Sequence, residues 1–118
     1  KNEGGHIINI SSVDGKEVYQ GGAIYGASKS AIITLSKAMR MELSPDYNIR
    51  VTCIEPGTVD TALRNNITDE ELLNDKNYND ASEPKLEAKN IADAVLYALS
   101  QPDSVNVNEL LIKPTGKS

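Results

Sequence analysis

The order of two strand-like runs and the helical pattern between them constrains the fold of this chain most strongly. Residues 6–10 are almost continuously apolar, as in a sheet that is covered on both faces. Residues 49–54 are rich in β-branched side chains and are followed by Pro56 and Gly57. Residues 25–43 have helical spacing, and Pro45 is expected to end that helix. A strand, a helix and a strand in this order predict a right-handed crossover and a parallel pair of strands.

The same alternation continues in the second half of the chain. A stripe at helical spacing predicts a helix over residues 87–100, and residues 105–112 follow as a third strand. The predicted fold class is therefore α/β, with three parallel strands and their helices. The residues expected to be buried in the first helix are Ala27, Ala31, Leu35, Ala38 and Met39 or Met41, and those of the second helix are Ile91, Ala94, Val95, Ala98 and Leu99.

Composition excludes several classes of function. The 118 residues suffice for one domain, and a net charge of -5 with dispersed basic residues argues against nucleic-acid binding. No apolar run has the length of a membrane span. The single cysteine, Cys53, lies in a predicted strand and is expected to be a buried small apolar residue. His6 has no neighbouring residues at metal-ligand spacing, so no metal site is expected.

Three polar residues have a spacing that indicates acid–base chemistry. Tyr25 and Lys29 are four residues apart in YGASK, and therefore on one face of a helix. A nearby ammonium favours the ionised form of a phenol. Ser12 follows the first strand and supplies a hydroxyl that can hold a carbonyl oxygen while Tyr25 exchanges a proton.

The segments GGHIINISS, YGASK and IRVTCIEPGTVDT together resemble the short-chain dehydrogenase/reductase family, over nearly the whole chain. The resemblance implies a Rossmann-like doubly wound parallel sheet and an NAD(P)-dependent oxidoreductase that interconverts an alcohol and a ketone or aldehyde. It also implies that Tyr25 is the general acid/base, that Ser12 orients the substrate oxygen, and that Lys29 assists the phenol and binds the nicotinamide ribose. The cofactor-binding residues that it implies are Tyr25, Lys29, Pro56, Gly57, Thr58, Val59 and Thr61.

The loop after the first strand borders the substrate in members of this family. Asp14 and Tyr19 are therefore candidate substrate residues beside Ser12 and Tyr25, with a solvent-facing turn and a packing role as the alternatives for Asp14 and Tyr19. Ser11 points to the opposite side of an extended chain and is expected to make a local turn hydrogen bond. Glu55 departs from the residues that are commoner before Pro-Gly, which suggests a subfamily resembling the hydroxy-acid and serine dehydrogenases.

The polar loop of residues 58–83 is interpreted as a substrate lid, with an uninvolved surface loop as the alternative. A short helix at residues 69–73 is expected there, with Thr68 and Glu71 as a capping box.

None of the glycines is spaced as GxGxxG, the phosphate-binding pattern of dinucleotide folds. We therefore expect residues 1–118 to be the C-terminal part of a single NAD(P)-binding domain whose dinucleotide-binding half is absent, in a protein roughly twice this size. The resemblance implies NAD or NADP as cofactor, a small alcohol or carbonyl substrate, a homodimer or homotetramer, and a cytoplasmic enzyme. Two alternatives remain open, a nucleotide-binding or regulatory protein without turnover and an inactive fragment.

Overall fold

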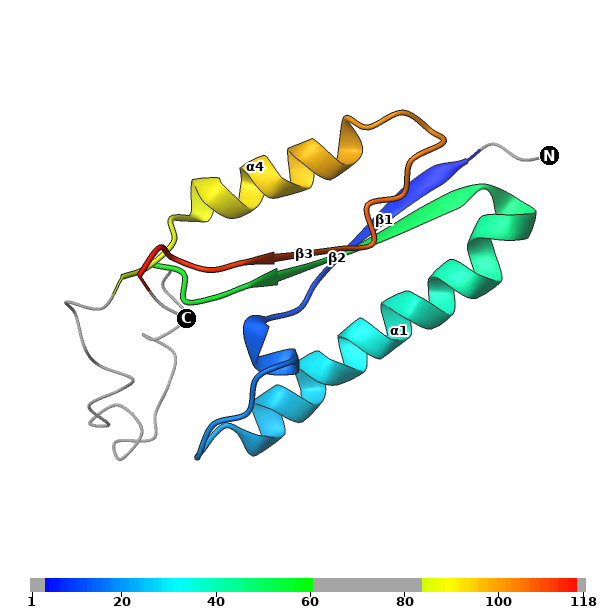
Figure 1. Ribbon diagram of the computed structural model, residues 1–118. Coiled ribbons are helices and arrows are strands. Elements are labelled where there is room, and N and C mark those ends of the chain that lie inside the picture. Colours follow the sequence, from blue (N-terminus) through cyan, green and yellow to red (C-terminus); the bar gives the residue numbers. More distant parts are fainter. Residues whose placement is uncertain (1–3, 61–83, 117–118) are drawn as a thin grey trace.

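The structure is a three-stranded parallel sheet with helices on both faces. The computed structural model describes residues 4–60 and 84–116. Strands β1 (Gly5–Ile10), β2 (Ile49–Pro56) and β3 (Glu109–Ile112) pair in the order β1-β2-β3, all parallel. Helices α1 (Ala23–Tyr47) and α4 (Ala88–Leu99) lie on opposite faces of this sheet (Figure 1). The predicted α/β fold with three parallel strands is therefore confirmed.

The central strand β2 forms the core. Val51, Cys53 and Ile54 are fully buried, because β2 pairs on both edges and is covered on both faces. The prediction that Cys53 is buried is confirmed, and burial raises the pKa of its thiol.

Strand β3 is shorter than the predicted 105–112, because a side chain takes the place of its first backbone bonds. Asn106 Oδ1 accepts from the Val51 backbone N–H at 2.9 Å, and Asn106 Nδ2 donates to the Val51 carbonyl at 2.9 Å. The peptide groups of Val51 are thus paired without a continuous ladder, and regular pairing begins at Glu109.

Helix α1 differs from the prediction at its end and in its buried face. Pro45 lies inside the last turn, and the helix ends at Tyr47, followed by the C-cap Asn48, whose φ of 55° is in the left-handed region typical of helix ends. The helix thus continues for two residues beyond Pro45, although proline has no N–H to donate to the preceding turn.

The face of α1 that lies against the sheet carries the buried residues Ile33 and Ser36. The predicted burial of Ala27, Ala31 and Leu35 is wrong, since all three are exposed, Leu35 by 55%. Ala38 is half-buried, and of the alternatives Met39 and Met41 the first is half-buried and the second is 78% exposed. The apolar stripe therefore lies on the side of α1 away from the sheet.

Helix α4 has the predicted position, and Ala98 of the predicted stripe is fully buried. Ile91, Ala94 and Val95 are half-buried, whereas Leu99 is 44% exposed. Its first turn is held by Asn90, whose Oδ1 accepts from the Glu87 backbone N–H at 2.7 Å. None of the helices in the described ranges is long and apolar enough to cross a membrane.

Candidate active site

Ser12 stands at the carboxyl edge of the sheet, where β1 ends. Ser11 continues the ladder with a bond from its N–H to the Ile54 carbonyl at 2.7 Å. Ser12 then caps the short 3₁₀ helix η1 (Val13–Gly15), its Oγ accepting from the Asp14 N–H at 3.1 Å. The Ser12 residue is 7% exposed. A hydroxyl that accepts one hydrogen bond still has its own proton to donate.

The loop that contains Ser12 is pressed against the turn of α1 between Tyr25 and Lys29. Ser11 Oγ donates to the Lys29 carbonyl at 2.7 Å, so its bond reaches another element and is not the expected local turn bond. A Cβ on Gly15 would lie 3.0 Å from the Lys29 carbonyl, and a Cβ on Gly26 would lie 3.0 Å from the Asp14 carbonyl. Glycine at both positions therefore permits the close approach of loop and helix.

Tyr25 and Lys29 face one another on α1, as expected from their spacing. The Lys29 ammonium lies 5.5 Å from the centroid of the Tyr25 ring, which is a cation–π distance. Tyr25 is 42% exposed, so its phenol is accessible from outside the protein. The fold thus gathers the loop of Ser12 and the Tyr25–Lys29 pair at one edge of the sheet.

The Pro-Gly segment follows β2 at the same edge. Gly57 donates its N–H to the Ile112 carbonyl at 2.7 Å, and a Cβ on Gly57 would meet the Pro114 ring at 3.2 Å. Packing against the end of β3 thus accounts for glycine here without any ligand. Val59 pairs with Leu86 as an isolated parallel bridge, and the Leu86 N–H donates to the Thr58 carbonyl at 2.7 Å.

Several predicted features after this point lie outside the described residues. These are Thr61, the helix at residues 69–73 with its Thr68–Glu71 box, and most of the expected lid.

The two further candidate substrate residues lie in and after η1. Asp14 is half-buried within η1, although a solvent-facing turn was the alternative. Tyr19 is 48% exposed, and its ring covers the position that a Cβ on Gly22 would take. This contact agrees with the packing role for Tyr19.

Sequence reasoning missed a charged cluster beneath this loop. The Lys16 ammonium lies 3.3 Å from Glu55 Oε1 and 2.5 Å from Glu109 Oε1. The signal for it was Glu55 itself, since a glutamate at the end of an otherwise buried strand needs a partner.

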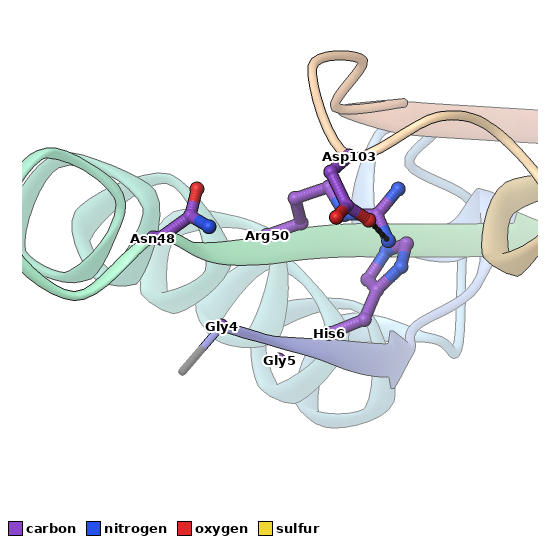
Figure 2. Close-up of a pocket in the computed structure, with 6 residues that line it drawn as sticks. All are labelled: Gly4, Gly5, His6, Asn48, Arg50 and Asp103. Atoms are coloured by element: carbon purple, nitrogen blue, oxygen red, sulfur yellow. Dashed lines mark ion pairs between the residues drawn. The ribbon is translucent and has the colours of Figure 1, made fainter. Parts of the chain in front are cut away.

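A surface hollow of about 330 Å³ lies at the other end of the sheet, where β1 and β2 begin (Figure 2). In it Arg50 Nη2 lies 3.6 Å from Asp103 Oδ1. His6 instead bonds through Nε2 to Thr52 Oγ1 at 2.7 Å, and burial, together with Arg50, lowers the pKa of its imidazole. Within residues 4–60 and 84–116, no group of three or more His, Cys, Asp or Glu side chains could hold a metal. Because this hollow lies where β1 and β2 begin, it is remote from Ser12 and Tyr25 at the carboxyl edge of the sheet. It is lined by Gly4, Gly5, His6, Asn48, Arg50 and Asp103.

Comparisons with known proteins agree with this architecture. The model of the short chain dehydrogenase family matches residues 1–72. An uncharacterized oxidoreductase of Staphylococcus aureus strain MRSA252 is 43% identical over 110 residues, which are 93% of this chain and 42% of that protein. An uncharacterized oxidoreductase of Staphylococcus epidermidis is 44% identical over 114 residues, or 97% of this chain and 44% of that protein. The chain therefore belongs to the short-chain dehydrogenase family, and it spans less than half the length of these relatives.

Solved structures support the same assignment. The closed form of a serine dehydrogenase complexed with NADP+ superimposes with a TM-score of 0.83 at 32% identity, covering 96% of this chain and 45% of that one. A 4-hydroxyisoleucine dehydrogenase complexed with NADH gives a TM-score of 0.71 at 30% identity, covering 96% and 48%. The sheet and helices described above are thus the Rossmann-like fold of this family.

Proposed function

We propose that the intact protein is an NAD(P)-dependent oxidoreductase that interconverts an alcohol and a carbonyl compound, and that residues 1–118 are the C-terminal part of its single cofactor-binding domain. The observation that carries this proposal is the contact between the Ser12 loop and the turn of α1 that bears Tyr25 and Lys29. Ser11 Oγ donates to the Lys29 carbonyl, and Gly15 packs closely against the same carbonyl. The loop that carries Ser12 and the helix turn that carries Tyr25 and Lys29 are therefore in direct contact.

In this proposal Tyr25 exchanges the proton of the substrate oxygen, and the Ser12 hydroxyl donates a hydrogen bond to the same oxygen without giving up its proton. Such general acid–base transfer contributes about 10²–10⁴-fold to a rate. Lys29 supplies positive charge beside the phenol.

The donor set also fits a nicotinamide cofactor. Lys29 has an ammonium with three N–H donors and lies next to an accessible phenol, which suits the adjacent hydroxyls of a ribose. The backbone of Pro56, Gly57, Thr58 and Val59, together with Thr61, would border the nicotinamide. When bound, the cofactor supplies or accepts the hydride.

The relatives suggest which alcohols to test first. The serine and 4-hydroxyisoleucine dehydrogenases above, and an acetoin dehydrogenase of Salmonella typhimurium with a TM-score of 0.71 at 28% identity, act on small compounds in which a hydroxyl lies near a second polar group. We propose a substrate of this class for the intact protein, bordered by Asp14 and Tyr19 beside Ser12.

The decisive experiment compares Tyr25→Phe with Tyr47→Phe in the intact protein. Tyr47 is the matched control, because it lies at the far end of the same helix and is 57% exposed. Turnover of the alcohol panel with NAD+ or NADP+ should fall about 10²–10⁴-fold in Tyr25→Phe and stay unchanged in Tyr47→Phe. Binding of the reduced cofactor, followed by its fluorescence, should persist in both. Full activity of Tyr25→Phe would refute the assigned role, and cofactor binding without any turnover in the parent protein would favour the non-catalytic alternative.

We also propose that the intact protein is a homodimer or homotetramer. Support comes from large apolar side chains that are exposed on the helices, among them Ile24, Leu35 and Met41 on α1 and Leu96 on α4. Light scattering on the intact protein measures the mass directly, and a monomer at micromolar concentration would contradict this proposal.

A further inference from the structure

One lysine connects the candidate substrate loop to two strands of the sheet. Lys16 follows η1 directly, and its ammonium lies between Glu55 at the end of β2 and Glu109 at the start of β3. Lys16 Nζ is 3.3 Å from Glu55 Oε1 and 2.5 Å from Glu109 Oε1. Three segments far apart in the sequence thus meet at a single charged group.

The burial of Glu55 makes this contact important. The Glu55 side chain has no exposed surface, and neither of its oxygens receives a hydrogen bond within the described residues. A buried carboxylate without a counter-charge costs several kcal/mol. Lys16, whose side chain is 41% exposed, brings a positive charge to 3.3 Å from Glu55 Oε1 from the loop above.

The charges in the cluster are divided unequally. Burial and the neighbouring Glu109 raise the pKa of Glu55, whereas the contact with Lys16 lowers the pKa of Glu109. The same contact raises the pKa of Lys16. The charge of Lys37 on α1 also lowers the pKa of Glu109. The Cys53 thiol lies near both carboxyl groups. The ion pair proper is therefore that of Lys16 and Glu109, and Glu55 holds a proton more readily than an ordinary glutamic acid.

Lys16 and Ser12 are at the two ends of the same short turn, so the charged cluster is connected to Ser12 through the backbone. The Lys16 N–H donates to the Val13 carbonyl at 2.9 Å, so the backbone of Lys16 continues the turn that Ser12 caps. Next to it, Glu17 Oε2 pairs with Lys113 Nζ at 2.7 Å, which attaches the same loop to the segment after β3. Fixing the Lys16 side chain therefore fixes the short turn in which Ser12 stands.

We propose that Lys16, Glu55 and Glu109 form a clamp that holds the Ser12 loop on the sheet, and that Lys16 and Glu109 are positioning residues for Ser12. The second part of this proposal rests on the proposed function, because it requires Ser12 to meet the substrate. Glu55 lies buried at the end of β2, with Oε1 3.3 Å from the Lys16 ammonium, and lines the position that this ammonium takes.

The test uses the intact protein and two independent measurements. Lys16→Met and Glu109→Gln break the ion pair, whereas Glu55→Gln leaves Lys16 and Glu109 in place and Lys16→Arg keeps the charge. Lys89→Met is the matched control, since it removes an exposed ion pair of 2.7 Å on α4, away from the loop.

Hydrogen–deuterium exchange of peptides covering residues 11–20 reports on the loop without any need for activity. We expect exchange to rise about tenfold in Lys16→Met and Glu109→Gln, the change that loss of one good contact produces. Lys16→Arg, Glu55→Gln and Lys89→Met should match the parent protein. Equal exchange in Lys16→Met and Lys89→Met would overturn the clamp.

Steady-state kinetics report on Ser12. We expect kcat/KM to fall about 10- to 100-fold in Lys16→Met and Glu109→Gln, and to stay near the parent value in Lys16→Arg. The reason is that a catalytic group displaced by about 1 Å loses a factor of this size. The double variant should be no worse than either single one, since both remove the same contact. Faster exchange with unchanged kcat/KM would overturn the positioning role, whereas an inactive parent protein with the expected exchange pattern would refute the proposed function and leave the clamp intact.

Discussion

Gly15 is the position at which a single methyl group tests the architecture of the site. It belongs to η1 and lies against the turn of α1 that carries Lys29. In Gly15→Ala the new Cβ would come within 2.8 Å of Ile33 Cδ1 and 3.0 Å of the Lys29 carbonyl carbon and oxygen. The end of the Ile33 side chain can rotate, but the helix backbone at Lys29 cannot give way locally. The loop and the helix must therefore separate.

The cost follows from these contacts. Forcing an extra methyl group into a packed interface destabilises a protein by about 1–3 kcal/mol. This corresponds to a fall of about 2–12 °C in the midpoint of thermal unfolding. Separation of the loop from α1 also moves Ser12 away from Tyr25, so kcat/KM is expected to fall about 100-fold.

Thermal unfolding and turnover of the intact protein measure both effects, with Gly5→Ala as the matched control. A Cβ on Gly5 would meet only Ile49 Cγ1, at an ordinary 3.8 Å, so this variant should stay within about 0.5 kcal/mol of the parent protein. If Gly15→Ala keeps both the midpoint and the turnover of the parent, then the close contact of loop and helix does not exist in solution, and the carrying observation of the proposed function is lost.

Three further variants test other parts of the structure. Ser11→Ala removes the hydrogen bond to the Lys29 carbonyl and should lower the free energy of unfolding by about 1 kcal/mol and also reduce turnover. An unchanged free energy of unfolding would show that this hydrogen bond does not stabilise the protein. Asn106→Ala leaves the buried Val51 N–H without its partner and should cost about 1–3 kcal/mol with kcat/KM unchanged, and a loss of turnover would show that its effect reaches the site. Because folding raises the pKa of Glu55 above its ordinary 4.5, the stability it contributes is full below pH 4.5 and is lost as the pH rises through the folded pKa. Glu55→Gln should therefore become more stable relative to the parent as the pH rises above 4.5, measured by unfolding at several pH values, and a constant difference would refute the assignment.

Local patterns predicted the elements of the fold, but not the details that depend on contacts across the chain. The strand and helix order followed from apolar runs and helical spacing, since these depend on neighbouring residues. The early end expected at Pro45 was wrong, since the helix continues for two residues beyond it, although proline has no N–H to donate to the preceding turn. The start of β3 was also misplaced, because the bonds of Asn106 to Val51 join residues 55 positions apart.

The buried face of α1 could not be predicted because the helix has apolar residues on more than one side. Leu35 belongs to the most regular stripe, yet it is 55% exposed, whereas the polar Ser36 is fully buried. Ser36 is tolerated there because its Oγ donates to the Ile32 carbonyl at 2.8 Å and accepts from Asn9 Nδ2 at 2.9 Å. The hydrogen bond from Asn9 on β1 thus allows a polar residue on the buried face of α1.

The candidate site was predictable where its residues are close in sequence. The spacing of Tyr25 and Lys29 placed both on one helix face, and the position of Ser12 after a strand placed it at the carboxyl edge. The contact of Lys16 with Glu55 and Glu109 was missed, because no local pattern indicates that a loop lysine reaches two strands. The packing of Gly57 against Pro114 was also missed, because these two residues are far apart in the sequence.

The Asn106 side chain makes the sheet sensitive to deamidation, because both of its amide atoms bond to Val51. Deamidation of Asn106 would keep an acceptor for the Val51 N–H but would turn the donor that faces the Val51 carbonyl into a second, negatively charged acceptor. Attraction between those two groups would become repulsion, at a strand whose residues 51–55 are fully buried. A slow reaction at one side chain would thus loosen the last segment of the sheet without any change in the gene.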